Sequence, residues 1–373
     1  MRQVVPLALA ALTIFAVPSH ARDYKVLVLQ ALTGGAAPFG VSFADGITLA
    51  AEEVNQKHFL GEGNSIQLVV ADDATDRSQT MSLLSRYAAD QEVLAVLGPT
   101  GGAVSVAGAA LANELEIPAI ITTNSTEVLQ QGPYSFINSL PAAVALPTLV
   151  DYVANSRKRK SCTIIGLRDI EAYVTLQKWF TDGITGKGVA IRSLEQLGSA
   201  DSDFSSVATK VATQDQDCVF ISAPPSQGAN IVLQLKQAGL DPAVEIFGHM
   251  AFASPEFVLR GGAAVEGVAF IGDWVPGGFD EMSSAFAKNF EARFGHVPDN
   301  SNAMGYTAMT VLATALKKAG PEATRQTVME QLTLTRDVPV VIGSGTYSYD
   351  QNRYPTAKIN VLVVKGGVFQ KAP

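Results

Sequence analysis

Three short loops carry the groups that could bind a small polar molecule. Residues 32–40 and 98–102 are rich in glycine, and residues 122–126 offer hydroxyl and amide groups. Each loop follows an apolar segment and precedes a helical one, so free backbone N–H groups at the helix starts could bind an anion. Tight turning alone would also explain the glycines, and helix capping would also explain the Thr/Asn/Ser run.

Sequence signatures of catalysis and of metal binding are absent. The chain has no GxSxG elbow, no HExxH motif and no GxxxxGK[ST] loop, and Thr33-Gly34-Gly35 lacks the GxGxxG spacing of a dinucleotide site. The three histidines beyond the N-terminal segment, His58, His249 and His296, are scattered. We therefore expect a binding protein that is not an enzyme and that uses no metal and no cofactor.

The N-terminus has the features of an export signal. A basic residue precedes an apolar stretch over residues 4–17, and Ser19-His20-Ala21 places small residues at the two positions that a signal peptidase reads. The apolar stretch is too short to span a membrane. We expect residues 1–21 to be removed, so that the mature chain starts at Arg22 and does not insert into a membrane.

Composition favours a large, soluble, exported protein. The 373 residues include 27 Lys+Arg and 35 Asp+Glu, a net charge of -8, and 47% of the residues are hydrophobic. Such an acidic chain has no electrostatic footprint for nucleic acid or anionic lipid. The length and the hydrophobic content are sufficient for two lobes.

Apolar strands alternate with helices along most of the chain. Continuous apolar strands in this alternation predict parallel sheets covered by helices on both faces, and therefore an α/β fold. The order repeats in two series of similar size. Strands are predicted at 24–30, 66–71, 93–97, 117–121, 163–167, 189–194, 219–222, 245–248, 338–342, 346–349 and 359–364, and helices at 41–55, 76–90, 103–114, 146–155, 172–185, 204–213, 228–238, 279–294 and 302–318.

Cys162 and Cys218 are the two cysteines of the chain, and each lies at the start of an apolar strand. An even pair can form a disulfide in an oxidising compartment. Two interpretations stay open. The cysteines are separate buried thiols, or they form a bridge between neighbouring parallel strands, whose paired residues lie near the distance that a disulfide needs.

A set of short motifs runs through the mature chain in a characteristic order and spacing. They are Leu32-Thr33-Gly34-Gly35, Phe39-Gly40, Gly46-Ile47, Ala50-Ala51-Glu52-Glu53-Val54-Asn55, Asp72-Asp73, Leu97-Gly98-Pro99, Ile117-Pro118-Ala119-Ile120, Asp203-Phe204-Ser205, Gly239-Leu240 and Val265-Glu266-Gly267-Val268. Together they resemble the type I periplasmic solute-binding proteins of the leucine/isoleucine/valine-binding-protein-like group. No single motif is specific, so the resemblance rests on their order.

This resemblance implies two Rossmann-like lobes joined by three crossover strands, with a ligand cleft between lobes that close like a hinged trap. We expect the N-terminal lobe at 23–139 plus 275–349 and the C-terminal lobe at 140–274 plus 350–373. The fold's strand order would make the strands of Cys162 and Cys218 neighbours, and a bridge then requires their Cα atoms to lie roughly 4.4–6.8 Å apart. The family implies a periplasmic protein, here expected to be a monomer, that presents its ligand to an ABC permease of the inner membrane.

The family's ligand contacts carry over in part to the first two loops. Phe39 matches an aromatic residue before the glycine of the first loop. Gly102 stands where a serine usually holds the ligand carboxylate. Thr100, or the backbone N–H groups of Gly101 and Gly102, would have to substitute for that serine.

The third loop and the second lobe supply the remaining matches. The third loop keeps a hydroxyl with Thr123, Asn124 and Ser125. Tyr173 matches a family tyrosine that follows an aspartate, here Asp169, although Val174 replaces the glycine after it. The acid that usually binds the ligand ammonium falls near His249 and Met250, and Pro224-Pro225 stands where a second aromatic contact is expected.

The loss of both the carboxylate serine and the ammonium-binding acid changes the expected ligand. A buried ammonium without a counter-charge is costly, so a free aliphatic amino acid is less favoured than in the family. Phe39, Tyr173, Met250 and Trp274 would instead suit an aromatic or other apolar carboxylate. The alternatives are a sensor that uses the same trap to signal to a membrane receptor and, more remotely, an exported α/β enzyme.

Overall fold

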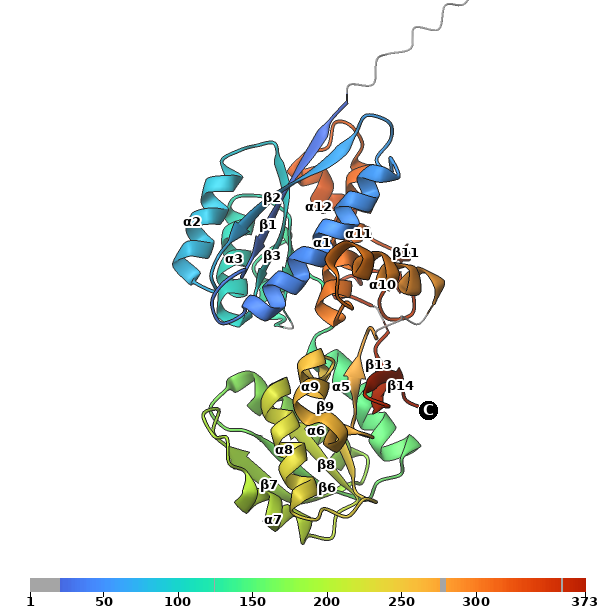
Figure 1. The fold of residues 1–373 in the computed structure, drawn as a ribbon. Helices are drawn as coiled ribbons and strands as arrows, with labels where there is room; N and C mark the ends of the chain where they lie inside the picture. The colour runs from blue at the N-terminus through green and yellow to red at the C-terminus, as the bar shows by residue number, and fades with distance from the viewer. Residues whose placement is uncertain (1–20, 124, 276–279, 357) are drawn as a thin grey trace, which may run out of the picture.

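The computed structural model describes residues 21–123, 125–275, 280–356 and 358–373. They form two lobes, each built on its own sheet (Figure 1). The predicted signal segment lies outside the described residues except for Ala21, and Asn124 also lies outside them. Within the described ranges, no helix is both long and apolar enough to cross a membrane.

The N-terminal lobe contains a parallel five-stranded sheet in the order β2-β1-β3-β4-β5. Two later strands form a separate antiparallel pair. The strands are β1 (Asp23–Gln30), β2 (Ser65–Asp72), β3 (Val93–Thr100), β4 (Ala119–Thr122), β5 (Ser135–Ile137), β11 (Val338–Pro339) and β12 (Thr346–Tyr347). The helices are α1 (Ala37–Gln56), α2 (Arg77–Ala88), α3 (Gly102–Glu114), α4 (Glu127–Gln130), α10 (Glu281–Phe294), α11 (Asn300–Ala319) and α12 (Arg325–Thr333).

The C-terminal lobe contains a seven-stranded sheet in the order β14-β13-β10-β9-β8-β6-β7, in which β13 and β14 are antiparallel to their neighbours. The strands are β6 (Ser161–Leu167), β7 (Ala190–Leu197), β8 (Cys218–Ser222), β9 (Glu245–Gly248), β10 (Ala269–Gly272), β13 (Asn360–Lys365) and β14 (Val368–Lys371). The helices are α5 (Ala142–Asp151), α6 (Glu171–Gly186), α7 (Ser205–Ala212), α8 (Pro225–Gln237) and α9 (Pro255–Gly261).

The chain passes between the two sheets three times, after β5, after β10 and after β12 (Figure 1). The predicted α/β fold of two lobes joined by three crossings is therefore confirmed. The sequence positions at which each lobe begins and ends stay a prediction. Two of the predicted C-terminal strands shrink to the short β11–β12 pair, while β5 and β10 are short strands that the sequence pattern did not reveal.

The continuous apolar pattern of β1 arises because both faces of the N-terminal sheet are covered. Val26 and Val28 pack with α1 and α11 in one cluster, whereas Leu27 and Leu29 belong to a second cluster with α2 and α3. Helices on both faces of a parallel sheet require strands with this composition.

Glycines allow α1 and α11 to pack closely, and this brings their N-termini to the same side of the lobe. A Cβ on Gly46 would lie 2.0 Å from the carbonyl oxygen of Asn302, and a Cβ on Gly305 would lie 2.2 Å from that of Phe43. No side chain fits in such spaces. The close packing places the starts of two helices beside the cleft described below.

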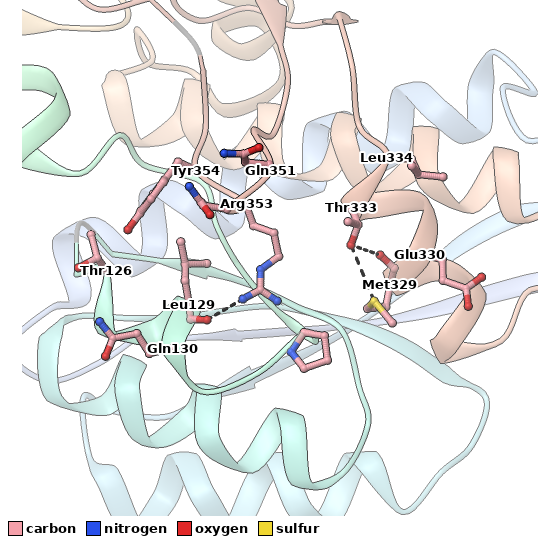
Figure 2. A pocket seen from close by; sticks show the side chains of 12 residues that line it. Thr126, Leu129, Gln130, Met329, Glu330, Thr333, Leu334, Gln351, Arg353 and Tyr354 are labelled. Carbon is pink, nitrogen blue, oxygen red and sulfur yellow. Dashed lines mark hydrogen bonds between the residues drawn. The ribbon is translucent and has the colours of Figure 1, made fainter.

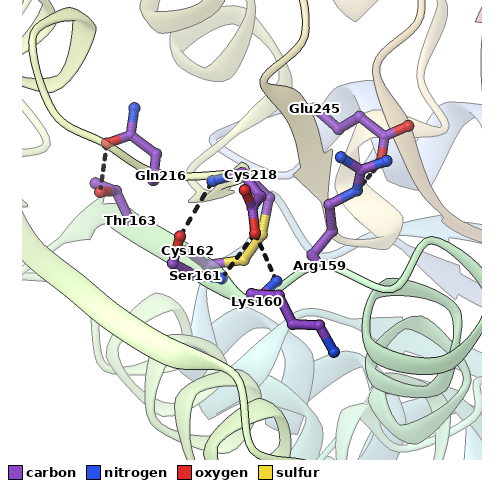
Figure 3. The surroundings of a disulfide bond; sticks show 9 residues. Arg159, Lys160, Ser161, Cys162, Thr163, Gln216, Cys218 and Glu245 are labelled. Atoms are coloured by element: carbon purple, nitrogen blue, oxygen red, sulfur yellow. Dashed lines mark hydrogen bonds and ion pairs between the residues drawn. A yellow bond between two sulfur atoms is a disulfide. The ribbon is translucent and has the colours of Figure 1, made fainter.

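Cys162 and Cys218 form a disulfide, so the bridge interpretation is the correct one (Figure 3). They face each other in register on β6 and β8, their Cα atoms are 4.5 Å apart, and both are fully buried. This distance falls within the range that a bridge requires. The disulfide joins the starts of two parallel strands, at the opposite edge of the sheet from the strand ends that face the cleft.

Candidate functional site

A cleft of about 680 Å³ is lined by residues of both lobes. It lies at the carboxyl ends of the parallel strands, where open α/β sheets bind ligands. Eight of the ten predicted contact residues line it: Phe39, Thr100, Gly101, Gly102, Thr123, Tyr173, His249 and Met250. Their roles in binding stay predictions. Trp274, which was also expected to contribute to the apolar cleft, is instead buried in the core of the N-terminal lobe and does not line the cleft.

The third loop contributes less than predicted. Thr123 lines the cleft, but Ser125 does not belong to its lining. The backbone N–H of Ser125 donates to Thr123 Oγ1 at 3.2 Å, which closes a local turn. Asn124 lies outside the described residues, so its predicted role is untested.

Seven helices begin at the cleft. Residues in or directly before the first turns of α1, α3, α5, α6, α8, α9 and α11 line it. Side chains cap only two of these helices, through Ser254 at α9 and Asp299 at α11. Among the described residues, the other five starts have no side-chain cap. At α1, however, the N–H groups of Ala37, Phe39 and Gly40 already donate to backbone carbonyls, so free N–H groups remain at α3, α5, α6 and α8. Uncapped N–H groups and the positive ends of helix dipoles favour an anion at this place.

The start of α3 offers an unpaired backbone donor among the predicted contacts. Gly101 has a φ of 110° and donates its N–H to the Thr122 carbonyl at 3.4 Å, so its N–H is already partly used. Gly102 is the first residue of α3, and its N–H has no acceptor among the described residues. Gly102 can therefore donate to a ligand oxygen.

Thr100 is a weaker candidate than the sequence indicates. Its hydroxyl donates to Gln30 Oε1, while Gln30 Nε2 donates to the Leu97 carbonyl at 3.2 Å. Thr100 and Gln30 are both buried. The hydroxyl proton is thus used inside the N-terminal lobe, and the backbone of α3 is the better donor for a carboxylate.

A network around Asp72 fixes the first loop and with it Phe39. The Asp72 carboxylate accepts from the Leu32 N–H at 2.9 Å and from the Thr33 hydroxyl at 2.7 Å. Gly34 adopts a φ of 80° against the Ala74 carbonyl, a conformation and a space that exclude a side chain. The loop leads directly into α1, whose first turn places Phe39 at the cleft with 46% of its surface exposed.

His249 is locked in the wall of the C-terminal lobe. Its Nε2 lies 3.1 Å from the Ala223 carbonyl, and its Nδ1 accepts from the Ala251 N–H at 3.3 Å. Burial lowers the pKa of His249 to about 4, although the Ala223 carbonyl acts in the opposite direction. The ring is therefore neutral, with its proton on Nε2, and neither nitrogen is free to bind a ligand.

Tyr173 packs against this histidine, with ring centroids 5.5 Å apart. Its backbone carbonyl accepts from Ser222 Oγ at 3.0 Å and from Gln177 Nε2 at 3.1 Å, which fixes the first turn of α6. Burial raises the pKa of Tyr173 to about 12, so the phenol keeps its proton. Tyr173 thus presents a rigid aromatic surface with one potential donor.

Two acidic residues of the cleft were missed by the sequence analysis. Glu256 of α9 lines the cleft from the C-terminal lobe and lies 3.6 Å from the Arg260 side chain. Asp299 lines it from the N-terminal lobe, where it accepts from the Asn302 N–H at 2.9 Å and the Ser42 hydroxyl at 3.2 Å. An acidic residue of the second lobe, Glu256, therefore lines the cleft at a position that the family motif near His249 and Met250 did not indicate. Both residues stand at helix starts, a pattern that the sequence could have revealed.

The charge of the described lining is unusual for a site that would bind an anion. It contains no Lys or Arg side chain, and its ionisable side chains are Tyr173, His249, Glu256 and Asp299. The apolar part of the lining is large: Phe39, Phe43, Leu140, Ile170, Leu176, Met250, Ile271 and Met304. A bound carboxylate would depend on backbone N–H groups and hydroxyls, and the body of the ligand would be apolar.

A second cavity, of about 840 Å³, lies away from the cleft on the N-terminal lobe. It is a groove between α4, α12 and the turn that contains Gln351, Arg353 and Tyr354 (Figure 2). None of the predicted ligand contacts lines this groove.

Comparison with known proteins identifies the family to which this architecture belongs. A family model described as "Periplasmic binding protein" matches residues 23–368. Among curated proteins, the Leu/Ile/Val-binding protein homolog 3 of Brucella melitensis is 25% identical over 349 residues, which are 91% of this chain and 91% of the relative.

Two solved structures share the fold. A branched-chain amino acid transporter substrate binding protein from Streptococcus pneumoniae, in complex with isoleucine, has a TM-score of 0.80 and 21% identity, and the match covers 94% of this chain and 99% of that one. A solute binding protein of an ABC transporter from Rhodopseudomonas palustris, in complex with 3,4-dihydroxy benzoic acid, has a TM-score of 0.79 and 21% identity, with coverage of 94% and 95%.

Proposed function

Because this chain belongs to the periplasmic binding protein family, we propose that it is an exported solute-binding protein of an ABC importer. In this proposal it captures a small organic carboxylate with an apolar body between its lobes and delivers it to the permease. The ligand is an amino acid or a related aromatic or aliphatic acid. No bond is made or broken.

The single observation that carries this proposal is the composition of the cleft. Four helix starts without side-chain caps, those of α3, α5, α6 and α8, face a cleft whose described lining has no Lys or Arg side chain and many apolar side chains. The uncapped N–H groups, above all that of Gly102, suit a carboxylate. The apolar walls suit a hydrocarbon body, which gains roughly 25 cal/mol for each Å² buried.

Closure follows from the position of the cleft. A ligand that contacts Phe39 and Gly102 of one lobe and Tyr173 of the other binds better when both lobes contact it together. Differential affinity for the closed state is what shifts the population toward that state. The closed protein is then the form that the permease would recognise.

The ligands of the two structural relatives support both branches of the proposed class. One relative is in complex with isoleucine and the other with 3,4-dihydroxy benzoic acid. In this chain, Glu256 would distinguish an amino acid from an acid without an amino group, because a carboxylate in the lining can balance a ligand ammonium. Its present contact with Arg260 is weak, since that pair is largely exposed.

A calorimetric comparison of matched ligands tests this assignment. A thermal-shift screen of amino acids and of aromatic and aliphatic acids first identifies binders, since a ligand at a hundred times its Kd adds roughly 2.7 kcal/mol to stability. Phenylalanine and 3-phenylpropionate are then titrated into the wild-type protein and into Glu256→Gln.

If Glu256 binds an ammonium, phenylalanine binds the wild type more tightly and loses this advantage in Glu256→Gln. If 3-phenylpropionate binds better to both proteins, the ligand is a deaminated acid. Failure of every carboxylate in the screen would contradict the proposed function.

We also propose that the protein is exported to the periplasm. This part of the proposal rests on the signal features of the sequence, since residues 1–20 lie outside the described part of the structure. Intact-mass analysis of the periplasmic fraction should give a chain that starts at Arg22. A retained Met1 or an added lipid would refute the predicted cleavage.

A further inference from the structure

The third crossing does not pass directly from one lobe to the other. After β12 the chain folds back on itself, and Tyr349 pairs with Pro355 in an antiparallel bridge. The Thr356 N–H donates to the Ser348 carbonyl at 2.9 Å, and the Asp350 N–H donates to the Tyr354 carbonyl at 2.9 Å. Residues 348–356 therefore form a small hairpin, which we call the crossing hairpin.

The base of the crossing hairpin belongs to the N-terminal lobe. The Tyr349 N–H donates to the Thr335 carbonyl at 3.1 Å. The Tyr349 ring is buried, and its centroid lies 5.3 Å from that of Phe136 and 5.2 Å from that of Tyr347. Pairing with the C-terminal lobe starts only at Asn360, opposite Gly272 of β10.

The tip of the hairpin is attached to the same lobe by Arg353. Its guanidinium donates to the Leu129 carbonyl at 2.6 Å and to the Gly132 carbonyl at 2.7 Å, at the end of α4. Figure 2 shows this side chain reaching from the turn across the groove to α4. The Tyr354 side chain packs beside it against the apolar cluster of α2 and α3.

The turn that presents Arg353 is itself well defined. Asp350 Oδ1 accepts from the N–H groups of Asn352 and Tyr354, each at 2.8 Å. Arg353 adopts a φ of 65°, a left-handed conformation that is uncommon for a residue with a side chain. Such a conformation persists only where the surroundings hold it, and here two charge-assisted hydrogen bonds to carbonyl groups do so.

We propose that Arg353 is a positioning residue for lobe closure, because it clamps the crossing hairpin to α4 and makes residues 348–356 move with the N-terminal lobe. Residues 348–356 then take no part in the bend of the third crossing. This inference shifts the expected lobe limit from 349/350 to after residue 356. It concerns the ligand-free protein and is independent of the nature of the ligand.

The functional consequence lies in the open state. A crossing that is clamped along most of its length restricts the range of lobe orientations, so less conformational entropy is lost when the ligand selects the closed state. Releasing the clamp would lengthen the free part of the crossing and widen the open ensemble.

Arg336 provides a matched control within the same lobe. Its guanidinium also bonds two carbonyl groups near a helix end, those of Thr333 and Thr335 at 3.2 Å and 2.7 Å. Both acceptors belong to α12 and the residue pair after it. The Thr335 carbonyl also accepts from the Tyr349 N–H at the base of the hairpin, but Arg336 makes no hydrogen bond to residues 348–356 themselves among the described residues. Arg336→Ala removes a similar cap and leaves the clamp intact.

Interlobe distances measured between spin labels test the proposal without a ligand. Labels are attached at Glu114→Cys on the N-terminal lobe and Asp215→Cys on the C-terminal lobe, both exposed positions. The native cysteines are buried in their disulfide and should not react. The distance distribution should be broader in Arg353→Ala than in the wild type, and unchanged in Arg336→Ala.

Hydrogen exchange gives a second measurement. Loss of two hydrogen bonds to a charged group should speed exchange of the amides of residues 350–356 at least about tenfold in Arg353→Ala. If Arg353→Ala does not fold, Arg353→Gln keeps one amide donor and should show a smaller effect of the same kind. A distance distribution equal to that of the wild type, or equal broadening in Arg336→Ala, would overturn the proposal. Failure of the ligand screen would leave these readouts unaffected.

Discussion

The His249–Tyr173 pair and the start of α3, on opposite walls of the cleft, use their polar groups in opposite ways. On the C-terminal side, both ring nitrogens of His249 and the backbone carbonyl of Tyr173 are bonded within the protein. On the N-terminal side, α3 begins without a side-chain cap, and the Gly102 N–H has no acceptor among the described residues. These groups of His249 and Tyr173 are satisfied without a ligand, whereas the Gly102 N–H is not; the starts of α5, α6 and α8 on the C-terminal wall also lack side-chain caps.

This difference suggests that one region recognises the shape of the ligand and the other recognises its charge. A wall whose polar groups are already paired presents a fixed surface, and it can contribute mainly apolar contact and steric selection. A wall with unpaired donors gains a hydrogen bond when a ligand oxygen arrives. We therefore expect the His249–Tyr173 pair to select which ligand bodies fit, and the start of α3 to bind the ligand carboxylate.

The largest expected effect tests whether the C-terminal wall is held independently of binding. Replacing Cys162 and Cys218 by serine removes a bridge with a sequence separation of 56. In the chain-entropy account this lowers the free energy of unfolding by about 4 kcal/mol. Chemical denaturation would measure this loss, while calorimetry at a temperature where the variant is folded should give unchanged affinity. A large loss of affinity would show that the wall depends on the disulfide.

The second effect concerns the protonation of His249. Its pKa is about 4 in the folded protein against 6.5 for the ordinary side chain, so the unfolded chain binds more protons between these values. Stability is therefore complete above pH 6.5 and falls as the pH is lowered toward 4, by on the order of 3 kcal/mol. Denaturation curves of the wild type and His249→Phe across this range would show the slope and its loss in the variant.

Asp273 changes the pH dependence of stability in the opposite direction to His249. Its contribution must therefore be eliminated by mutation before the His249 slope is measured. Burial raises its pKa to about 6, against the effects of its own backbone N–H and of the Asn300 side chain. Its folded form therefore favours the proton, and stability decreases as the pH rises from 3.8 to about 6. In an Asp273→Asn background the observed net slope of stability against pH should become steeper, because only the contribution of His249 remains. An unchanged or shallower slope would contradict the account of both groups.

The third effect tests the N-terminal wall. Gly102→Pro removes the N–H that we assign to the ligand carboxylate, at a first helical position that proline tolerates. Loss of one hydrogen bond to a charged group costs roughly 1.5–3 kcal/mol, so affinity for an acid should fall about ten- to hundredfold. Gly102→Ala keeps the N–H, and its Cβ would meet no atom within 4 Å. Equal affinities of the two variants would break the proposed division between the walls.

The smallest effect is expected at Tyr173. If this residue acts through its ring, Tyr173→Phe should change affinity by less than about threefold. Tyr173→Ala should weaken binding roughly tenfold or more, because it removes a large apolar surface. Calorimetry on both variants with the same acid would measure this contrast. A loss in Tyr173→Phe as large as that in Tyr173→Ala would assign the phenol hydroxyl a direct role.

The sequence predicted the fold and most of the cleft because both depend on local patterns. Apolar strands alternate with helices, and loops at strand ends must gather at one edge of a parallel sheet. Phe39, Tyr173 and Met250 could be placed at the cleft in this way. Long-range partners could not be predicted, such as the Gln30 side chain that uses the hydroxyl proton of Thr100.

The two acidic residues that the sequence analysis missed also owe their position at the cleft to long-range packing. Asp299 resembles an ordinary helix cap, and Glu256 an ordinary acidic residue in a first helical turn. Only the packing of α9 and α11 beside the cleft gives them a further role. The clamp of Arg353 was equally invisible, because its acceptors are backbone carbonyls more than two hundred residues earlier in the chain.

Titration of acids against their primary amides tests the central claim most directly. The amide keeps the body and shape of each ligand but loses the negative charge that the helix starts should stabilise. For the acid that gives the largest thermal shift, calorimetry should show binding at least about tenfold tighter than that of its amide. If the amide binds as tightly as the acid, or if only solutes without a carboxylate bind, the cleft does not recognise an organic acid through its backbone N–H groups.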